Sequence, residues 1–307
     1  MRIFTLTLNP AYDIHACCDE FFAFSEVHAT VTARQAGGKG FNISRALTEN
    51  GVNNTALIVL GEDNCEDFVK MSNGLNCIFF KEKGRIRENL TLHSNGGKET
   101  RISFNGGEVS KGILQNIYNE IKPNKETVVT FTGSIPKGIT KEEAKDFLKL
   151  LKKDGAKIVV DTKSFDLADI YEVSPWLVKP NQDELGAYFG EEITTIEQAI
   201  NKAKEMNEKG IENVIVSLGK DGAVFCGENE IITAKTPNIK VVSTIGAGDS
   251  MIAGFISAKS NGLPNEESFK TAVSYGSAAC LSEGSLPPKA QNIIEIKELV
   301  EITKKIL

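Results

Sequence analysis

The sequence has no long apolar run and no recognisable export signal. Among its 307 residues, no apolar stretch approaches the roughly 20 residues that a membrane-spanning helix needs. The chain begins Met1-Arg2-Ile3-Phe4-Thr5 and passes directly into an alternating apolar segment, without the apolar core and small-residue cleavage site of a signal peptide. These two absences predict a soluble protein located in the cytoplasm.

Paired metal-binding and redox motifs are also missing. The six cysteines are spread along the chain without C-x-x-C spacing. The adjacent residues Cys17 and Cys18 would point to opposite faces of a strand, so we do not expect them to act as a redox pair. The three histidines, His15, His28 and His93, contain no i, i+4 pair. We therefore expect reduced thiols and no metal ion bound by histidine.

The chain has no excess of positive charge. Its formal net charge is -6 at pH 7, with 25% charged and 41% hydrophobic residues. General binding to nucleic acid requires basic residues that displace counterions from phosphates, so we do not expect it here. The composition is instead typical of a folded chain with a sizeable core.

Short apolar segments alternate with helical patterns along most of the chain, which is typical of βαβ units and a mostly parallel sheet. No repeat or Pro-rich linker divides the sequence, so we predict one domain spanning residues 1–307. The expected strands are 3–8, 56–60, 127–132, 157–161, 176–179 and 214–218, and the expected helices are 42–49, 65–73, 141–152, 196–208, 249–260, 265–281 and 294–306.

Two stretches, 14–33 and 88–104, interrupt this alternation. In the second, two β-rich segments flank the turn Ser94-Asn-Gly-Gly97, which is the turn chemistry of a β-hairpin. We predict that both stretches form a small β-sheet lid inserted into the α/β domain. Because an exposed sheet edge is a natural pairing surface, we also expect a homodimer formed through this lid.

The segment Val241–Phe255 contains a Gly-Ala-Gly turn, Gly246 to Gly248, that leads directly into an apolar helix. Unpaired backbone N–H groups at such a helix start can bind a phosphoryl group. Asp249 at this position would repel phosphate, unless its role is to accept a proton from an attacking hydroxyl. Taken alone, the segment equally allows Asp249 to be a simple helix N-cap.

A second glycine-rich segment, Ala36–Arg45, places Lys39 among glycines before another helix. The glycines permit close approach of the backbone to a ligand, and the lysine supplies a positive charge, which suits a phosphorylated or hydroxylated ligand. The segment is neither a G-K-[ST] phosphate loop nor a G-x-G-x-x-G dinucleotide fingerprint. On its own it could equally be structural.

Together these two segments resemble the two signatures of the PfkB (ribokinase-like) carbohydrate kinase family. The resemblance covers nearly the whole chain, and the other matching segments, in family order, are Thr7–Asp13, Gly133–Gly138, Lys179–Glu184 and Ser217–Ala223. It implies a three-layer α/β/α fold with a mostly parallel central sheet and a small inserted β-sheet lid. It also implies ATP-dependent phosphorylation of a sugar, with Mg²⁺ on the ATP phosphates.

Family similarity implies a role for each matching residue. Asp249 would be the catalytic base, and Gly246, Ala247 and Gly248 would hold the transferring phosphoryl group. The residues implied to contact the sugar phosphate are Asp13, Gly38, Lys39, Asn42, Arg87, Arg101 and Ser134, with the two arginines neutralising a phosphate dianion. Those implied to contact the nucleotide are Asn181, Glu184, Ser217, Gly219 and Ser277, with Glu184 reaching Mg²⁺ through water.

Within the family the chain is most similar to 1-phosphofructokinases, through the segments 8–13, 175–181 and 241–251. The implied reaction converts fructose 1-phosphate to fructose 1,6-bisphosphate. Tagatose-6-phosphate kinases share most of these segments, and the run Ile86-Arg87-Glu88-Asn89 is similar to the Arg-Gln-Asn of minor 6-phosphofructokinases, so both remain alternatives. The three cations Lys39, Arg87 and Arg101 disfavour kinases of unphosphorylated sugars or nucleosides.

The residues disfavour two functions of other classes. A non-catalytic sugar-phosphate sensor could keep the fold, but it would have no need to combine Asp249, Glu184 and the Gly-Ala-Gly turn. An NAD-dependent dehydrogenase is disfavoured because its glycine fingerprint is missing.

Overall fold

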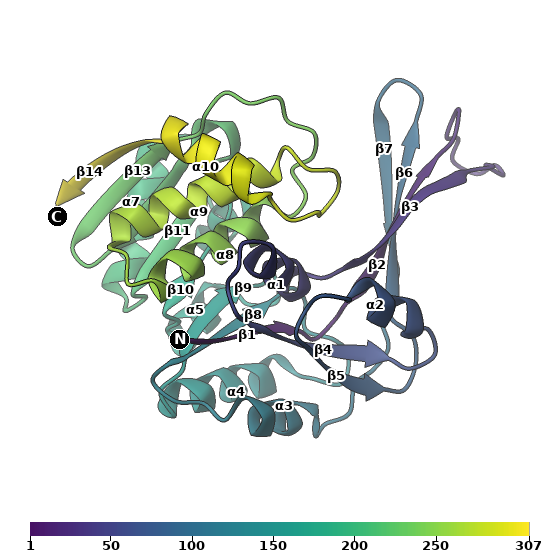
Figure 1. Ribbon diagram of the computed structural model, residues 1–307, viewed down its shortest axis with the longest axis horizontal. Helices are drawn as coiled ribbons and strands as arrows, with labels where there is room; N and C mark the ends of the chain where they lie inside the picture. Colours follow the sequence, from purple (N-terminus) through teal and green to yellow (C-terminus); the bar gives the residue numbers. More distant parts are fainter. Residues whose placement is uncertain (307) are drawn as a thin grey trace.

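The computed structural model describes residues 1–306, in which ten strands form one large sheet (Figure 1). Its strands are β1 (Arg2–Thr7), β4 (Thr55–Gly61), β5 (Cys77–Glu82), β8 (Thr127–Thr132), β9 (Lys157–Asp161), β10 (Leu177–Val178), β11 (Asn213–Ser217), β12 (Ala223–Gly227), β13 (Glu230–Lys235) and β14 (Glu301–Ile306). They lie in the order β14-β13-β12-β11-β10-β9-β8-β1-β4-β5. All neighbours from β11 to β5 pair in parallel, and only β12, β13 and β14 are antiparallel, so the predicted mostly parallel sheet is confirmed.

Helices cover both faces of this sheet, which confirms the three-layer arrangement. The helices are α1 (Lys39–Glu49), α2 (Glu66–Met71), α3 (Ile113–Ile121), α4 (Lys141–Lys153), α5 (Leu167–Val173), α6 (Gln182–Phe189), α7 (Ile196–Glu208), α8 (Ala247–Ser260), α9 (Asn265–Ala279) and α10 (Ala290–Leu299). Helices α3 to α7 share one hydrophobic core with the sheet, and α1, α8, α9 and α10 share the other. Because side chains alternate along a strand, Phe4 and Leu6 of β1 face the first core and Ile3 faces the second.

A second, four-stranded sheet projects from the large one (Figure 1). Its strands β2 (Ala11–Cys17), β3 (Thr30–Gly37), β6 (Arg87–Ser94) and β7 (Lys98–Ser103) lie in the order β3-β2-β6-β7. The predicted stretches 14–33 and 88–104 overlap these strands, but β2 begins at Ala11 and β3 extends to Gly37. Phe68 of α2 packs against Tyr12 and Phe41, which anchors the base of the small sheet.

The predicted helix 294–306 is wrong in its second half. Helix α10 ends at Leu299, and the following residues form β14, which pairs antiparallel with β13. Ile302 pairs with Ala234 and Ile306 with Glu230, and the free edge of β13 offers hydrogen-bond partners that a longer helix would not use. The hairpin of β12 and β13 and the edge strand β5 were not predicted either.

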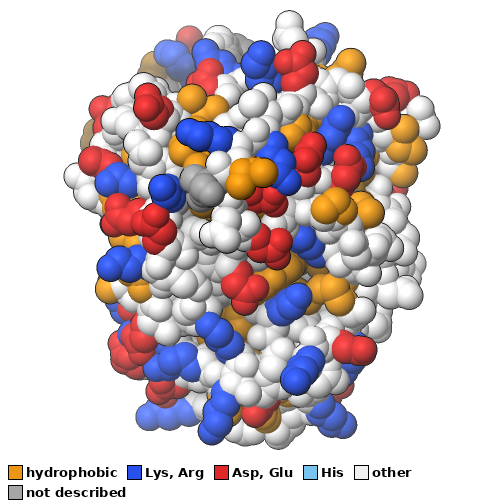
Figure 2. All heavy atoms as spheres, turned by 90° about the vertical axis from the view of Figure 1, so that its left-hand side faces the viewer, with side chains coloured by type: hydrophobic (Ala, Val, Ile, Leu, Met, Phe, Trp, Pro, Cys, Tyr) orange, Lys and Arg blue, Asp and Glu red, His pale blue; other side chains and the backbone are white. Residues whose placement is uncertain are grey.

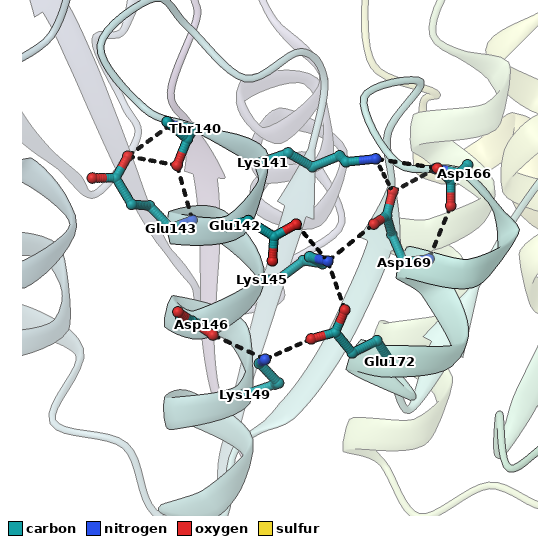
Figure 3. A network of polar contacts seen from close by, with 10 residues as sticks. All are labelled: Thr140, Lys141, Glu142, Glu143, Lys145, Asp146, Lys149, Asp166, Asp169 and Glu172. Atoms are coloured by element: carbon teal, nitrogen blue, oxygen red, sulfur yellow. Dashed lines mark hydrogen bonds and ion pairs between the residues drawn. The ribbon is translucent and has the colours of Figure 1, made fainter.

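A network of charged side chains joins α4 to α5 (Figure 3). Thr140 and Glu143 form a capping box at the start of α4. Lys145 is buried between three carboxylates: Glu142 at 2.9 Å, Asp169 at 3.2 Å and Glu172 at 2.6 Å. This network lies between two helices on one face of the large sheet and fixes their packing.

The face at the β14 end of the molecule carries Lys and Arg side chains interspersed with Asp and Glu (Figure 2). This mixture agrees with the modest net charge of the sequence. Within residues 1–306, no helix is both long enough and apolar enough to cross a membrane.

Candidate active site

The start of α8 has the features that favour anion binding. Gly246 precedes the helix with a φ of 77°, a left-handed conformation that glycine adopts without strain. Among residues 1–306 no side chain caps this helix, so the N–H groups of Gly248 and Asp249 have no side-chain acceptor. Such N–H groups, together with the helix dipole, favour a bound phosphoryl group.

Asp249 lies in the first turn of α8 and is only 6% exposed. The amide of Asn42 donates a hydrogen bond of 2.9 Å to its Oδ2 atom. Burial raises the pKa of Asp249 to about 6, with a further rise from the charge of Asp161, although Lys39, Asn42 and Lys179 oppose the shift. The N-cap alternative does not describe this side chain, because Gly246 is the N-cap and the carboxylate is bound by Asn42.

Two lysines surround a second buried carboxylate, Asp161. Lys39 Nζ lies 2.7 Å from its Oδ1 atom, and the buried Lys179 Nζ lies 3.8 Å from its Oδ2 atom. Burial lowers the pKa of Lys39, but the carboxylates of Asp161 and Asp249 outweigh it and the pKa is raised overall. Lys179 Nζ also lies against the helix start, since a Cβ on Gly248 would be only 3.0 Å from it. A cation therefore stands beside the proposed phosphoryl site.

The topology explains why these residues meet. Asp161 is the last residue of β9, and Lys179 immediately follows β10. Lys39 and Asn42 lie in the first turn of α1, which packs against β1 and α8. The carboxyl ends of parallel strands share one edge of the sheet, which is where ligands bind in open α/β folds.

A chain of polar contacts extends from the small sheet toward β8. Asn89 donates a hydrogen bond of 2.8 Å to Asp13 Oδ1 and accepts one of 2.9 Å from Arg87 Nη1. Arg87 Nε donates to the carbonyl of Asn9 at 3.4 Å, and the Asn9 amide donates to Ser134 Oγ at 2.8 Å. The structure thus brings together three of the predicted substrate-binding residues, Asp13, Arg87 and Ser134.

A small pocket lies beside Asn9 and Arg87. It is further lined by Gly61, Arg85 and Pro136. The lining also combines Lys83 with the carboxylates Glu82 and Glu108, so the charge around this pocket is mixed.

Arg101 is not brought to this cluster. It lies on β7 opposite Thr91, four residues further along β6 than Arg87, which corresponds to about 13 Å along the strand. Its guanidinium pairs with Glu99 at 3.0 Å, and its side chain is 63% exposed. Glu88 lies on the opposite face of β6 from Arg87 and approaches Arg34 at 3.8 Å, so it does not oppose the charge of Arg87 directly.

Asn181 and Glu184 form a capping box at the start of α6. The Asn181 side chain accepts a hydrogen bond from the Glu184 backbone N–H, and Glu184 Oε2 accepts one from the Asn181 N–H. Glu184 Oε1 lies 4.0 Å from Lys163 Nζ. One carboxylate oxygen is therefore used by the helix cap, and the other remains able to face a hydrated cation.

The predicted nucleotide-binding residues lie beyond this helix start. Asn181 bridges to Ser217, the last residue of β11, and Gly219 follows with a φ of 59°. Ser277 lies buried on α9, where its neighbour Gly276 packs against the first turn of α8. Gly38 is the N-cap of α1, next to Lys39.

Sequence reasoning missed four polar residues of this site: Asn9, Asn89, Asp161 and Lys179. Two of them carry a usable signal, because Asp161 is a charged residue that ends a buried strand and Lys179 directly follows one. Asn9 and Asn89 act mainly through contacts with residues far away in sequence, which no local pattern reports.

A helix-covered, mostly parallel sheet with a buried carboxylate beside an anion-binding helix start defines a phosphotransferase of the α/β class. Residues 7–292 match the model of the family described as pfkB family carbohydrate kinase. The chain therefore belongs to the pfkB family of carbohydrate kinases.

Curated relatives and solved structures agree with this assignment. A protein of Borreliella burgdorferi named 1-phosphofructokinase is 36% identical over 285 residues, covering 91% of this chain and 92% of that protein. A 1-phosphofructokinase of Bacillus subtilis is 34% identical, covering 92% and 93%. Phosphofructokinase-2 from Escherichia coli, solved in complex with substrates and products, has a TM-score of 0.89 and 26% identity, covering 97% and 99%. The same protein is also described in a tetrameric inhibited form.

Proposed function

We propose that this chain transfers the γ-phosphoryl group of ATP to a hydroxyl of fructose 1-phosphate, giving fructose 1,6-bisphosphate and ADP. The observation that carries the proposal is the position of Asp249. Its buried carboxylate, with a pKa raised by burial to about 6, stands in the first turn of an uncapped helix start. A base needs a pKa near the working pH to accept a proton efficiently, and this carboxylate meets that condition.

The chemistry follows from this arrangement. Asp249 accepts the proton as the O–H bond of the acceptor hydroxyl breaks, and the hydroxyl oxygen forms a bond to the γ-phosphorus. The bond between the γ-phosphorus and the bridging oxygen breaks, and its electron pair leaves with ADP. The hydrogen bond from Asn42 to Oδ2 fixes the carboxylate and leaves Oδ1 to face the acceptor.

Charge stabilisation is assigned to the helix start and to Lys179. The N–H groups of Gly248 and Asp249 would donate to the transferring group, whose charge develops in the transition state. The Lys179 ammonium, which lies against Gly248, would add a positive charge at the same place. Lys39 is held by Asp161 and would contact the sugar phosphate or the transferring group from the start of α1.

The residues present fit MgATP. Within residues 1–306 there is no cluster of three or more His, Cys, Asp or Glu side chains that could hold a metal ion by themselves. Mg²⁺ usually takes its ligands from phosphates and water together with one or two carboxylates, and Glu184 Oε1 is suited to that role. Bound there, Mg²⁺ would neutralise phosphate charge, while Ser217, Gly219 and Ser277 would contact the rest of the nucleotide.

Fructose 1-phosphate is chosen because the relatives that share a third of their residues with this chain are named 1-phosphofructokinase. The contacts of Asp13, Asn89 and Arg87 suit a sugar with a phosphate, since they combine hydroxyl-binding groups with a guanidinium. Tagatose 6-phosphate and fructose 6-phosphate are the alternative acceptors, and a sensor without catalysis is the alternative to a kinase.

The small sheet is proposed to act as a lid over the sugar. Its face carries Asp13, Asn89 and Arg87 toward the carboxyl edge of the large sheet, and its closure would exclude water that otherwise hydrolyses ATP. We also propose that two copies pair through this sheet, whose edge strands expose Val31 and Ile102. A cytoplasmic location remains a prediction from the sequence.

The proposal is tested by coupled ADP release with fructose 1-phosphate, fructose 6-phosphate, tagatose 6-phosphate and ribose, for the natural chain and Asp249→Asn. We expect the highest kcat/KM with fructose 1-phosphate. The amide cannot accept a proton, so turnover should fall by about 10³-fold or more while ATP binding persists. A variant that keeps its turnover would remove Asp249 from the chemistry, and a natural chain that binds these compounds without turnover would indicate a sensor.

A further inference from the structure

Gln35 lies in line with the proposed sugar-binding residues of the small sheet. Strands β2 and β3 pair so that Gln35 stands opposite Asp13, and β2 and β6 pair so that Asp13 stands opposite Asn89. Paired residues of neighbouring strands project to the same face of a sheet. The three side chains therefore form one polar row across the sheet, and Asp13 and Asn89 are already joined by a hydrogen bond of 2.8 Å.

The amide oxygen of Gln35 makes no hydrogen bond within the part of the chain that the structure describes. The Oε1 atom is fully buried, and it has no hydrogen-bond partner among residues 1–306. It lies against the loop between α9 and α10, because a Cβ on Gly284 would be only 3.1 Å from it. A larger residue at position 284 would push the amide aside, so the glycine leaves room for it.

The same loop carries a buried hydroxyl. Ser285 is 6% exposed, and its Oγ atom also lacks a hydrogen-bond partner among residues 1–306. Its Cβ lies 3.7 Å from the position that a Cβ on Gly246 would occupy. The loop thus contacts both Gln35 and the start of α8, whose first turn carries Asp249.

The chemistry of the amide selects the ligand group. Buried polar atoms in native proteins nearly always have a hydrogen-bond partner. We therefore expect a group from outside the chain to form the missing hydrogen bond to Gln35 Oε1. A carbonyl oxygen accepts a hydrogen bond, and therefore needs a donor. A sugar hydroxyl can donate, whereas an ionised phosphate cannot, and the cations suited to phosphate lie elsewhere, at Arg87, Lys39 and Lys179.

We propose that Gln35 binds one hydroxyl of the acceptor sugar phosphate and so helps to determine which sugar is used. This proposal rests on the function proposed above, because it assumes that a sugar phosphate binds between the small sheet and α8. Gln35 is a specificity-determining residue in this scheme and takes no part in proton or phosphoryl transfer.

The test compares Gln35→Leu, Gln35→Glu and the natural chain. Leu is one atom shorter but similar in volume and has no polar atom, whereas Glu retains an acceptor oxygen. Each is assayed with the sugar phosphate that the natural chain uses best and with analogues of it that lack one hydroxyl each. Gln115→Leu, at an exposed position of α3, is the matched control and should leave the kinetics unchanged.

We expect one analogue to be used about tenfold less well than the parent compound by the natural chain. Gln35→Leu should use the parent about tenfold less well, with an unchanged KM for ATP, and should no longer distinguish the parent from that analogue. Gln35→Glu should keep the distinction. If Gln35→Leu lost the same factor in kcat/KM with the parent and with every analogue, the role of Gln35 would be structural and the proposal would be overturned. No loss with any compound would overturn it as well.

Calorimetric binding of the same sugar phosphates without ATP gives a readout independent of turnover. If fructose 1-phosphate fails but another sugar phosphate binds, the substrate proposed above is wrong, and the Gln35 comparison is made with the compound that binds. Loss of discrimination in that comparison still supports Gln35. Absence of binding by every sugar phosphate would overturn both proposals.

Discussion

The side-chain amide of Asn42 donates a hydrogen bond of 2.9 Å to Asp249 Oδ2, joining residues 207 positions apart in the chain. This contact ties the first turn of α1 to the first turn of α8. Because the donor favours the ionised carboxylate, it lowers the pKa of Asp249 and partly offsets the rise caused by burial. The two helix starts therefore set the protonation state of the proposed base together.

The pH dependence of kcat/KM should report this base. Asp249 works only when ionised, and its pKa is raised to about 6, so kcat/KM should fall as the pH decreases through about 6. Replacing Asn42 by Leu removes the donor that favours the ionised form, so the pKa of Asp249 rises. The acid limb of the profile, where kcat/KM falls at low pH, therefore moves to higher pH.

A phosphate monoester also titrates near pH 6, and its contribution must be separated from that of the enzyme. The substrate is the same in both assays, so only the difference between the natural chain and Asn42→Leu reports Asp249. Identical acid limbs in the two profiles would contradict the assignment.

Substitutions around Asp249 should shift the acid limb in opposite directions. The negative charge of Asp161 raises the pKa of Asp249, so Asp161→Asn should lower it and move the limb to lower pH. The positive charge of Lys39 lowers the pKa of Asp249, so Lys39→Met should move the limb to higher pH. Both variants should also lose about 10- to 100-fold in kcat: Lys39→Met removes a positive charge near the transferring group, and Asp161→Asn releases Lys39 and Lys179 from the carboxylate that holds them.

The sign of each shift is the critical result, since any damage to the site lowers kcat. Full pH profiles of kcat/KM are measured for both variants beside the natural chain. Shifts in the same direction would mean that the acid limb belongs to another group.

The sequence predicts the part of the site that is encoded locally. Gly246 to Asp249 and Gly38 to Asn42 are helix starts. Their glycines and polar residues lie within a few positions of one another, so the pattern can be recognised in the sequence alone. Asp161 and Lys179 become site residues only because β9 and β10 are neighbours in the sheet. Arg101 could not be placed from sequence, because its distance from Arg87 depends on the register of β6 and β7.

In the fold, too, local features can be predicted from the sequence and features set by tertiary pairing cannot. The alternating strands and helices predict a mostly parallel sheet because each βαβ unit is local. Residues 301–306 were predicted as helical because their alternative partner, β13, lies about 70 positions away. The identity of an edge strand is thus decided by tertiary pairing rather than by its own pattern.

The charged network between α4 and α5 should support stability and not activity (Figure 3). Lys145 is 6% exposed at its side chain and contacts Asp169, which is equally buried. Lys145→Met would leave that carboxylate with one lysine fewer, so the melting temperature should fall by several degrees while kcat and KM stay unchanged. Lys149, whose side chain is 39% exposed, provides the control.

Thermal unfolding of Lys145→Met and Lys149→Met is followed beside the natural chain. We expect the smaller effect from Lys149→Met, because solvent screens exposed ion pairs. Equal melting temperatures for all three proteins would show that the buried network adds nothing to stability.

Two copies of the chain should pair through the small sheet. Val31 on β3 is 61% exposed, and Ile102 on β7 is 41% exposed, so both outer strands present apolar side chains to solvent. Phe22 and Phe104, 60% and 53% exposed, extend the apolar surface beyond the strands. Exposed apolar groups of this extent mark contact surfaces, and burying them in a dimer would remove them from water.

Sedimentation velocity at several concentrations should show a dimer for the natural chain and a monomer for the double variant Val31→Lys, Ile102→Lys. Charges on edge strands block pairing without altering the fold of the strand itself. Ile294→Lys, at a position of α10 that is also 61% exposed, carries the same change away from the small sheet and should remain a dimer. If the double variant stays dimeric while Ile294→Lys dissociates, the contact lies on the helical face of the large sheet instead.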